Sequence, residues 1–167
     1  VPDLLETLGD ELRVSERFAD LDEMIESTEP DVVAIPTGTE FHYDLCKRVL
    51  DHGVHIEVEK PMCVDLEQAD EILSIAEGKG VRVAVHHQGR VGAAMRTVQR
   101  AIGEGRIGDI RHLRASGKGY YGGYGLMNIG THLINTMLGI VGPCRRVVGS
   151  ARTADRPIGP VDVVPSP

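Results

Sequence analysis

The sequence lacks the features that mark membrane-spanning and nucleic-acid-binding proteins. No apolar run approaches the roughly 20 residues that a transmembrane helix needs. Basic residues are in the minority, 18 Lys and Arg against 25 Asp and Glu, and the formal net charge of -7 argues against a nucleic-acid or anionic-membrane surface. The nearest approach to a basic cluster, Arg111, His112, Arg114 and Lys118, is interpreted as the solvated face of a strand.

Cysteine is scarce as well. The three cysteines, Cys46, Cys63 and Cys144, are too few and too scattered for a disulfide framework, and they lack the spacing of metal ligands. We therefore expect reduced thiols, no bound metal and a cytoplasmic location. No secretory signal peptide is visible, although the chain begins at Val1 rather than at a methionine, which leaves a lost leader open.

Internal repeats are missing, and the only low-complexity tract is a proline-rich end at 157–167, which predicts a loop or a disordered end. The remaining composition is that of a globular protein, with 41% hydrophobic and 26% charged residues. At 167 residues the chain is long enough for one domain, or for one domain and part of a second.

Hydrophobic periodicity alternates between helix and strand over residues 20–103. Asp20 followed by Glu23 predicts the start of a first helix. The elements expected after it are a strand at 31–35 covered on both faces, a helix at 40–52, a strand at 55–59, a helix at 66–79, a strand at 81–86 and a helix at 92–103. This order predicts an α/β fold whose parallel strands are joined by right-handed crossovers.

The pattern changes after Gly108, where strands of a different kind predict a second, α+β domain. We therefore expect one domain at 1–108 and the beginning of another at 109–167. The elements expected in the second are a strand at 110–118, a loop rich in glycine and tyrosine at 117–125, a helix at 128–141 and a strand at 145–151.

Two candidate sites follow predicted parallel strands, whose carboxyl ends are where ligands bind in such sheets. In the first, Pro36 ends the strand and Gly38 lets the backbone approach a ligand; the alternative is an ordinary turn. In the second, Glu59 and Lys60 end the next strand, and the lysine can donate a hydrogen bond or a proton to a substrate oxygen. The bond from Lys60 to Pro61 is one that can be cis, and the alternative interpretation is a surface ion pair.

A third candidate lies on the helix expected at 128–141. Asn128 and His132 are four residues apart and so share one helical face, and histidine is suited to proton transfer at neutral pH. The alternative is a structural histidine with its hydrogen bonds satisfied. Aromatic side chains that suit stacking on a sugar, but are equally normal in a loop, precede this helix: Tyr120, Tyr121 and Tyr124.

These segments together resemble the glucose-fructose oxidoreductase / inositol dehydrogenase family. The resemblance is carried by residues 31–37, by His42, by 53–61 with its Glu-Lys-Pro, by 88–90, by 105–110 and by 130–132. It implies a partial Rossmann domain with a doubly wound parallel sheet, NAD or NADP as cofactor, a sugar, inositol or similar polyol as substrate, and a homo-oligomer.

The resemblance also implies roles for individual residues. Pro36, Thr37 and His42 would line the pyrophosphate and nicotinamide-ribose side of the cofactor. Glu59 and Lys60 would flank the nicotinamide, with Lys60 also bonded to the substrate oxygen. The remaining implied roles are a cofactor contact from Gln88 and acid/base catalysis by His132, with Asn128 beside it in the catalytic set.

Two departures from the family pattern stand out. The position of Asn128 commonly holds an aspartate, and an amide neither accepts a proton nor stabilises an imidazolium by charge. We therefore expect a different substrate or a slower proton transfer. No Gly-x-Gly-x-x-Gly precedes Asp31, so two or three further strand-helix elements are expected before Val1. Without them an edge of the sheet is left open, and this piece alone is expected to fold poorly and to bind little cofactor.

The function that the resemblance implies is that of an NAD(P)-dependent dehydrogenase or reductase, which transfers hydride between the nicotinamide and a hydroxyl or carbonyl carbon of the substrate. Two other functions remain open within the same resemblance. Some relatives use bound NAD transiently to cleave glycosidic bonds, and a degenerate member would bind nucleotide without catalysis.

Overall fold

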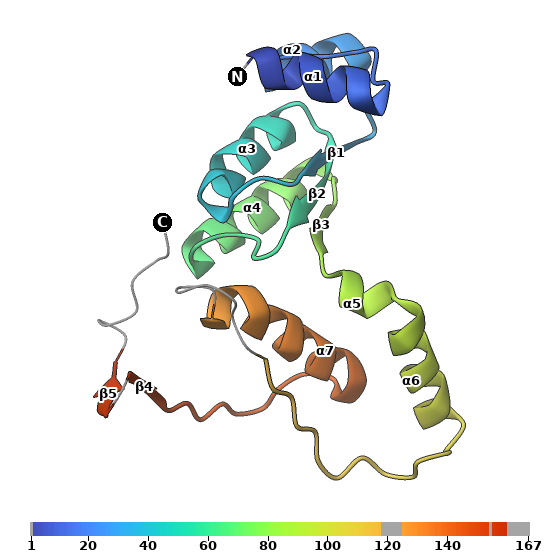
Figure 1. The fold of residues 1–167 in the computed structure, drawn as a ribbon, viewed down its shortest axis with the longest axis vertical. Coiled ribbons are helices and arrows are strands. Elements are labelled where there is room, and N and C mark those ends of the chain that lie inside the picture. The colour runs from blue at the N-terminus through green and yellow to red at the C-terminus, as the bar shows by residue number, and fades with distance from the viewer. Residues whose placement is uncertain (1, 118–124, 154, 160–167) are drawn as a thin grey trace. The chain divides into compact units, whose positions relative to one another are not determined.

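A computed structural model describes residues 2–117, 125–153 and 155–159 of the chain (Figure 1). The chain divides into two compact units, Val1–His86 and His87–Pro167. Compact units need not coincide with domains, so the expected domain boundary between residues 108 and 109 stays a prediction. Several residues discussed above lie outside the described ones: Lys118, the proline-rich end beyond 159, Tyr120, Tyr121 and Tyr124.

The first unit is built on a three-stranded parallel sheet. The strands β1 (Val32–Ile35), β2 (His55–Glu59) and β3 (Val83–His86) lie side by side in that order. Helix α3 (Thr39–Asp51) connects β1 to β2, and helix α4 (Leu66–Lys79) connects β2 to β3. The expected α/β fold, with the parallel sheet of a Rossmann-type domain, is confirmed.

Two helices, α1 (Pro2–Leu12) and α2 (Leu21–Thr28), precede the sheet, and only α2 is among the expected elements. It begins where the sequence predicts, because the carboxylate of Asp20 accepts hydrogen bonds from the backbone N–H groups of Asp22 and Glu23 at 2.9 and 3.0 Å. Local capping chemistry is therefore sufficient to locate this helix.

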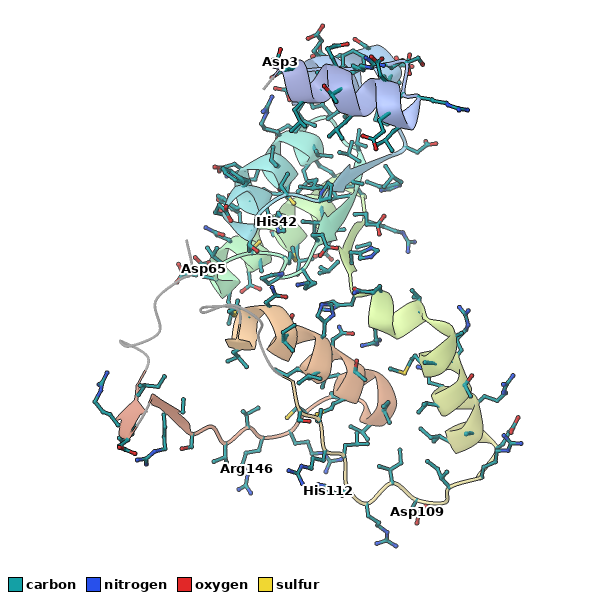
Figure 2. The ribbon with its side chains drawn as sticks, viewed as in Figure 1. Asp3, His42, Asp65, Asp109, His112 and Arg146 are labelled. Atoms are coloured by element: carbon teal, nitrogen blue, oxygen red, sulfur yellow. The ribbon has the colours of Figure 1, made fainter. Side chains whose placement is uncertain are left out.

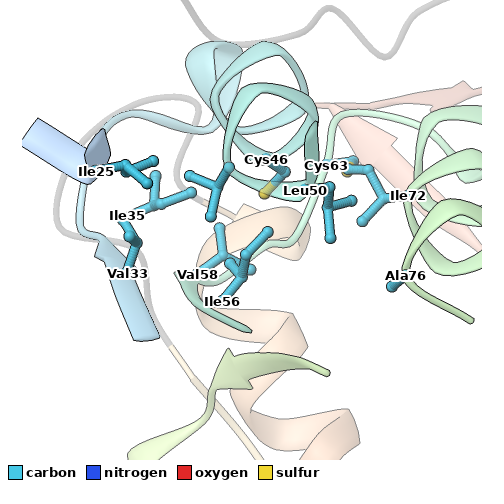
Figure 3. Packing of buried hydrophobic residues seen from close by; sticks show 11 residues of the cluster. Ile25, Val33, Ile35, Cys46, Leu50, Ile56, Val58, Cys63, Ile72 and Ala76 are labelled. Carbon is cyan, nitrogen blue, oxygen red and sulfur yellow. The ribbon is translucent and has the colours of Figure 1, made fainter. Parts of the chain in front are cut away.

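The core of the first unit lies on one face of its sheet. Val33 and Ile35 of β1 are 6% and 4% exposed, whereas Val32, the first residue of the strand, is 53% exposed. Figure 3 shows the buried side chains of the strands gathered with Cys46 and Leu50 of α3. The expectation that this strand is covered on both faces is wrong, because the helices of the unit contribute to a single cluster on one face.

The second unit begins with two consecutive helices, α5 (Gln88–Val91) and α6 (Ala93–Gly103). A π-helical turn, η1 (Gly125–Gly130), leads into α7 (Thr131–Val141), which confirms most of the helix expected at 128–141. The short strands β4 (Ala151–Thr153) and β5 (Arg156–Ile158) pair antiparallel.

The strands expected at 110–118 and 145–151 are wrong in the part of the chain that the structure describes. Residues 110–117 and 145–150 have no strand conformation there, and only Ala151 belongs to a strand. A strand is held by the hydrogen bonds of a neighbouring strand, and within the described ranges no pairing includes these segments. Alternation alone does not supply that partner.

Candidate functional site

The carboxyl ends of the parallel strands lie at one edge of the sheet of the first unit. Glu59, the last residue of β2, pairs with His86, the last residue of β3, and β1 ends directly before Pro36. The structure therefore brings four of the predicted cofactor residues to this edge: Pro36, Thr37, Glu59 and Lys60.

The loop after β1 leads into the N-terminus of α3 through Gly38. A methyl group at Gly38 would lie 2.6 Å from a carboxylate oxygen of Glu40, so a larger residue would displace that side chain. The hydroxyl of Thr37 lies in the same loop, 3.4 Å from the carbonyl oxygen of Gly38. The glycine thus keeps the main chain accessible where the first N–H groups of the helix have no partner within the helix.

The side chain of His42 contacts both the loop after β1 and the loop after β2. Its side chain is 0% exposed, and it lies on α3 with Nε2 3.0 Å from the carbonyl oxygen of Thr37 and Nδ1 3.0 Å from that of Pro61 (Figure 2). A ring N–H donates to a carbonyl oxygen in this arrangement. Because both nitrogens face main-chain carbonyls, His42 contacts the loops that carry the predicted cofactor residues.

Glu59 and Lys60 are both half-buried at the end of β2. The backbone N–H of Lys60 donates to Oε2 of Glu59 at 3.0 Å. The peptide bond between Lys60 and Pro61 is cis, as the sequence allowed. The carboxylate is thereby held against the main chain of the loop, next to the lysine that is predicted to meet the substrate.

A small hollow of about 220 Å³ opens at the same edge. It is lined by apolar residues of β1 and the loop after it, and by polar residues of the two neighbouring strands: Ala34, Ile35, Pro36, Glu57, Glu59 and His86. Nδ1 of His86 lies 2.6 Å from Oε1 of Glu57. The hydrogen bond to Glu57, with added attraction from the charge of Glu59, raises the pKa of His86 above its ordinary value.

Glu57 and His86 are absent from the residues predicted from sequence. A signal was present, because alternation along β2 places Glu57 and Glu59 on the same side of the strand. The partner strand that carries His86 is set by the sheet pairing, which the one-dimensional pattern does not contain.

The remaining predicted residues belong to the second unit. His132 lies in the first turn of α7, and Asn128 lies in the π-helical turn before it, where the hydroxyl of Thr131 donates to its carbonyl oxygen at 2.8 Å. Such turns occur often at functional sites. The rings of His87 and His132 meet edge to face, with centroids 5.6 Å apart and planes at 89°. Gln88 is exposed and begins α5, directly after His87.

The edge of the first unit suits the nicotinamide-ribose end of NAD. The hollow is lined by the apolar residues Ala34, Ile35 and Pro36 and by polar residues that include Glu59. Ribose hydroxyls and a carboxamide are neutral groups that need donors and acceptors, which the Thr37 hydroxyl and the Glu59 carboxylate offer. The residues present therefore fit this part of the cofactor.

Comparison with known proteins gives the same family as the sequence resemblance. Residues 5–87 match the model of an oxidoreductase family with an NAD-binding Rossmann fold. The chain belongs to this family, whose members bind NAD.

Individual relatives support the assignment. The oxidoreductase YhhX of Escherichia coli is 33% identical over 92 residues, which are 55% of this chain and 27% of YhhX. The D-glucoside 3-dehydrogenase of the same bacterium is 28% identical over 133 residues, 71% of this chain and 38% of that enzyme. The WlbA dehydrogenase of Bordetella pertussis, solved in complex with NADH and UDP-GlcNAcA, superposes with a TM-score of 0.69 at 26% identity, over 86% of this chain and 46% of that one. The chain spans less than half the length of each of these three.

Within the described residues, none of the helices has the length and apolar character that crossing a membrane requires.

Proposed function

We propose that the protein transfers hydride between NAD or NADP and a carbon that bears a hydroxyl or carbonyl group, in a sugar, inositol or similar polyol. The observation that carries the proposal is the meeting of Pro36, Thr37, Glu59 and Lys60 at the carboxyl edge of a Rossmann-type sheet in a member of an NAD-binding oxidoreductase family. The substrate class is supported by two relatives, a glucoside dehydrogenase and a dehydrogenase solved with a nucleotide sugar.

The roles of the residues follow from their chemistry. The ammonium group of Lys60 donates a hydrogen bond to the substrate oxygen, which stabilises negative charge on that oxygen as the hydroxyl is oxidised. His132 takes the hydroxyl proton in oxidation and returns it in reduction. Nicotinamide, when bound, would supply or accept the hydride. Thr37 and Glu59 would hydrogen-bond the ribose and carboxamide, and Gln88 would add a further contact to the cofactor.

His42 has a different role from the direct contact implied by the resemblance. We assign it to the support of the cofactor loops, because its ring is fully buried and both nitrogens face loop carbonyls. Asn128 orients the hydroxyl of the substrate or the ring of His132 through its amide, without contributing charge.

The proposal is tested with the protein encoded by the complete reading frame. Nicotinamide absorbance is followed with NAD and with NADP against a panel of sugars and inositols. Net formation of reduced cofactor is expected; substrate cleavage with no net reduction would instead indicate a glycoside-cleaving relative.

The variant Lys60→Ala separates an enzyme from a binding protein. We expect its turnover to fall by about two orders of magnitude or more. Lys79→Ala is the matched control, since Lys79 ends α4 and lies 3.6 Å from the carboxylate of Asp51 at the surface. Equal activity in the two variants, or no turnover and no cofactor binding by the unaltered protein, would refute the proposed function.

A further inference from the structure

The ring of His87 lies against the ring of His132. Their centroids are 5.6 Å apart and their planes cross at 89°, the edge-to-face arrangement that aromatic rings favour. His87 directly precedes α5, and His132 lies in the first turn of α7. Both residues belong to the second unit, so the contact is internal to one compact body.

In addition to the ring pair, a second contact joins α5 to α7. Nη1 of Arg90 donates to the carbonyl oxygen of Asn135 at 3.2 Å and lies 3.4 Å from its amide oxygen. Asn135 stands three residues after His132, so the two contacts hold successive parts of α7. The short helix therefore cannot shift along α7 without losing both.

Gly139 provides the space for this arrangement. A methyl group at this position would lie 3.0 Å from both Cδ and Nε of Arg90, closer than most real contacts of that kind. The stem of the arginine crosses α7 where glycine leaves room for it. The segment that begins with His87 is thus fitted to the helix that carries His132.

The helices that carry the ring pair contain few charged residues. Arg90 is the charged residue of α5, while neither the η1 turn nor α7 contains an Asp, Glu, Lys or Arg. The α6 helix, which packs on α5, carries Arg96 and Arg100. The imidazole of His87 is a titratable group in direct contact with the ring of His132.

We propose that His87 is a positioning residue for His132. Its ring limits the rotation of the His132 imidazole and couples the proton uptake of the two rings. This inference rests on the proposed function, in which His132 moves the substrate proton, and such a group must be held in a narrow range of orientations to act. His87 itself exchanges no proton with the substrate.

The test compares His87→Ala with His87→Phe in the full-length protein. The alanine variant removes the ring, whereas the phenylalanine variant keeps a ring and removes only its ability to titrate. We expect His87→Ala to lower kcat about tenfold or more with KM changed less than twofold, and His87→Phe to recover most of that loss. Circular dichroism and melting temperature establish that both variants fold.

A readout independent of turnover is the NMR titration of the His132 ring protons. Two imidazolium rings 5.6 Å apart repel each other. Even at the dielectric constant of water, this repulsion lowers the titration midpoint of each ring by about half a pH unit when the other is charged. Removing the titrating neighbour should therefore raise the His132 midpoint by roughly 0.3 pH unit or more in both variants.

The outcomes separate this inference from the proposed function. Suppose that the unaltered protein turns over substrate normally. The positioning role alone would then be overturned by an unchanged His132 titration in the variants, or by a kcat of His87→Ala equal to that of the unaltered protein. An altered titration in a protein that turns over no substrate would refute the proposed function, and with it the catalytic purpose of the ring contact. Failure of His87→Phe to exceed His87→Ala in kcat would also overturn the inference.

Discussion

Glu57 and His86 form a charge-assisted hydrogen bond between neighbouring parallel strands, with Oε1 and Nδ1 2.6 Å apart. Glu57 lies on β2, and His86 is the last residue of β3. Both side chains are close to half exposed and line the hollow at the edge of the sheet. The pair thus links the strand that ends in the predicted cofactor residue Glu59 to the strand that precedes the second unit.

The first prediction concerns the pH dependence of this pair. Because the hydrogen bond to Glu57 raises the pKa of His86 in the folded protein, folding takes up protons and the contribution to stability is present below the ordinary histidine value of 6.5. It is lost as the pH rises through the raised pKa. We expect the melting temperature of the unaltered protein to exceed that of His86→Asn at pH 6, with the difference shrinking by pH 9.

The matched control is His112→Asn, the same substitution at an exposed histidine of the second unit. Its melting temperature should follow that of the unaltered protein across the pH range. A His86→Asn difference that stayed constant from pH 6 to pH 9 would exclude an ionic contribution.

The second prediction concerns His42, which is 0% exposed and faces the carbonyls of Thr37 and Pro61. His42→Ala leaves a cavity in place of a fully buried ring and removes the ring's hydrogen bonding to the loop carbonyls, so we expect the free energy of unfolding to fall by about 2–4 kcal/mol. Affinity for NAD should fall too, since both loops lose their common support. Urea unfolding and fluorescence titration with NADH measure the two effects.

His52→Ala provides the comparison for His42, because His52 follows the same helix and contacts Asp22 at 3.0 Å on the surface. A loss of less than about 1 kcal/mol is expected there, with NADH affinity unchanged. Similar losses of affinity in both variants would contradict a specific role of His42 in supporting the cofactor loops.

Features encoded by local chemistry are those that the sequence predicts well. The cap at Asp20 and the ends of the helices expected at 40–52 and 66–79 depend on hydrogen bonds or backbone angles within a few residues. In the structure these helices end at Asp51 and Lys79, and the glycines that follow, Gly53 and Gly80, have positive φ. The parallel sheet follows from the order of such elements, because a strand, a crossover helix and a strand have few ways to pack.

Features that depend on distant partners are those that the sequence predicts poorly. The apolar run at 31–35 does not reveal that Val32 faces away from the core, because coverage is set by where the helices pack. The spacing around His42 does not reveal its bond to Pro61, which is 19 residues away. The contact of His87 with His132 similarly joins segments whose proximity is set by the packing of α5 on α7.

The third prediction uses two glycines near the end of α4. Gly80 has φ of 70°, a left-handed conformation that costs a residue with a Cβ about 1 kcal/mol or more, so Gly80→Ala should destabilise the protein. Gly78 lies inside the helix with open space around its Cα, so Gly78→Ala should stabilise it by about 0.5–1 kcal/mol. Urea unfolding of both variants measures these changes, and equal signs would contradict the assigned end of α4.

The fourth prediction concerns the amide of Asn128, which precedes the predicted acid/base His132 by four residues. Asn128→Asp replaces a neutral group with a carboxylate of nearly the same shape, and a nearby negative charge favours the protonated form of an imidazole. The pH midpoint of the oxidation rate should therefore move upward, since oxidation needs a neutral base. The kcat above this midpoint should rise, because the carboxylate stabilises the imidazolium that forms.

The control is Gln99→Glu, which adds the same charge on α6, where Gln99 contacts the carbonyl of Gly139 at 3.4 Å. This variant should leave the midpoint in place. A rate profile that is identical in Asn128→Asp and the unaltered protein would remove Asn128 from proton transfer and leave it only the orientation of substrate.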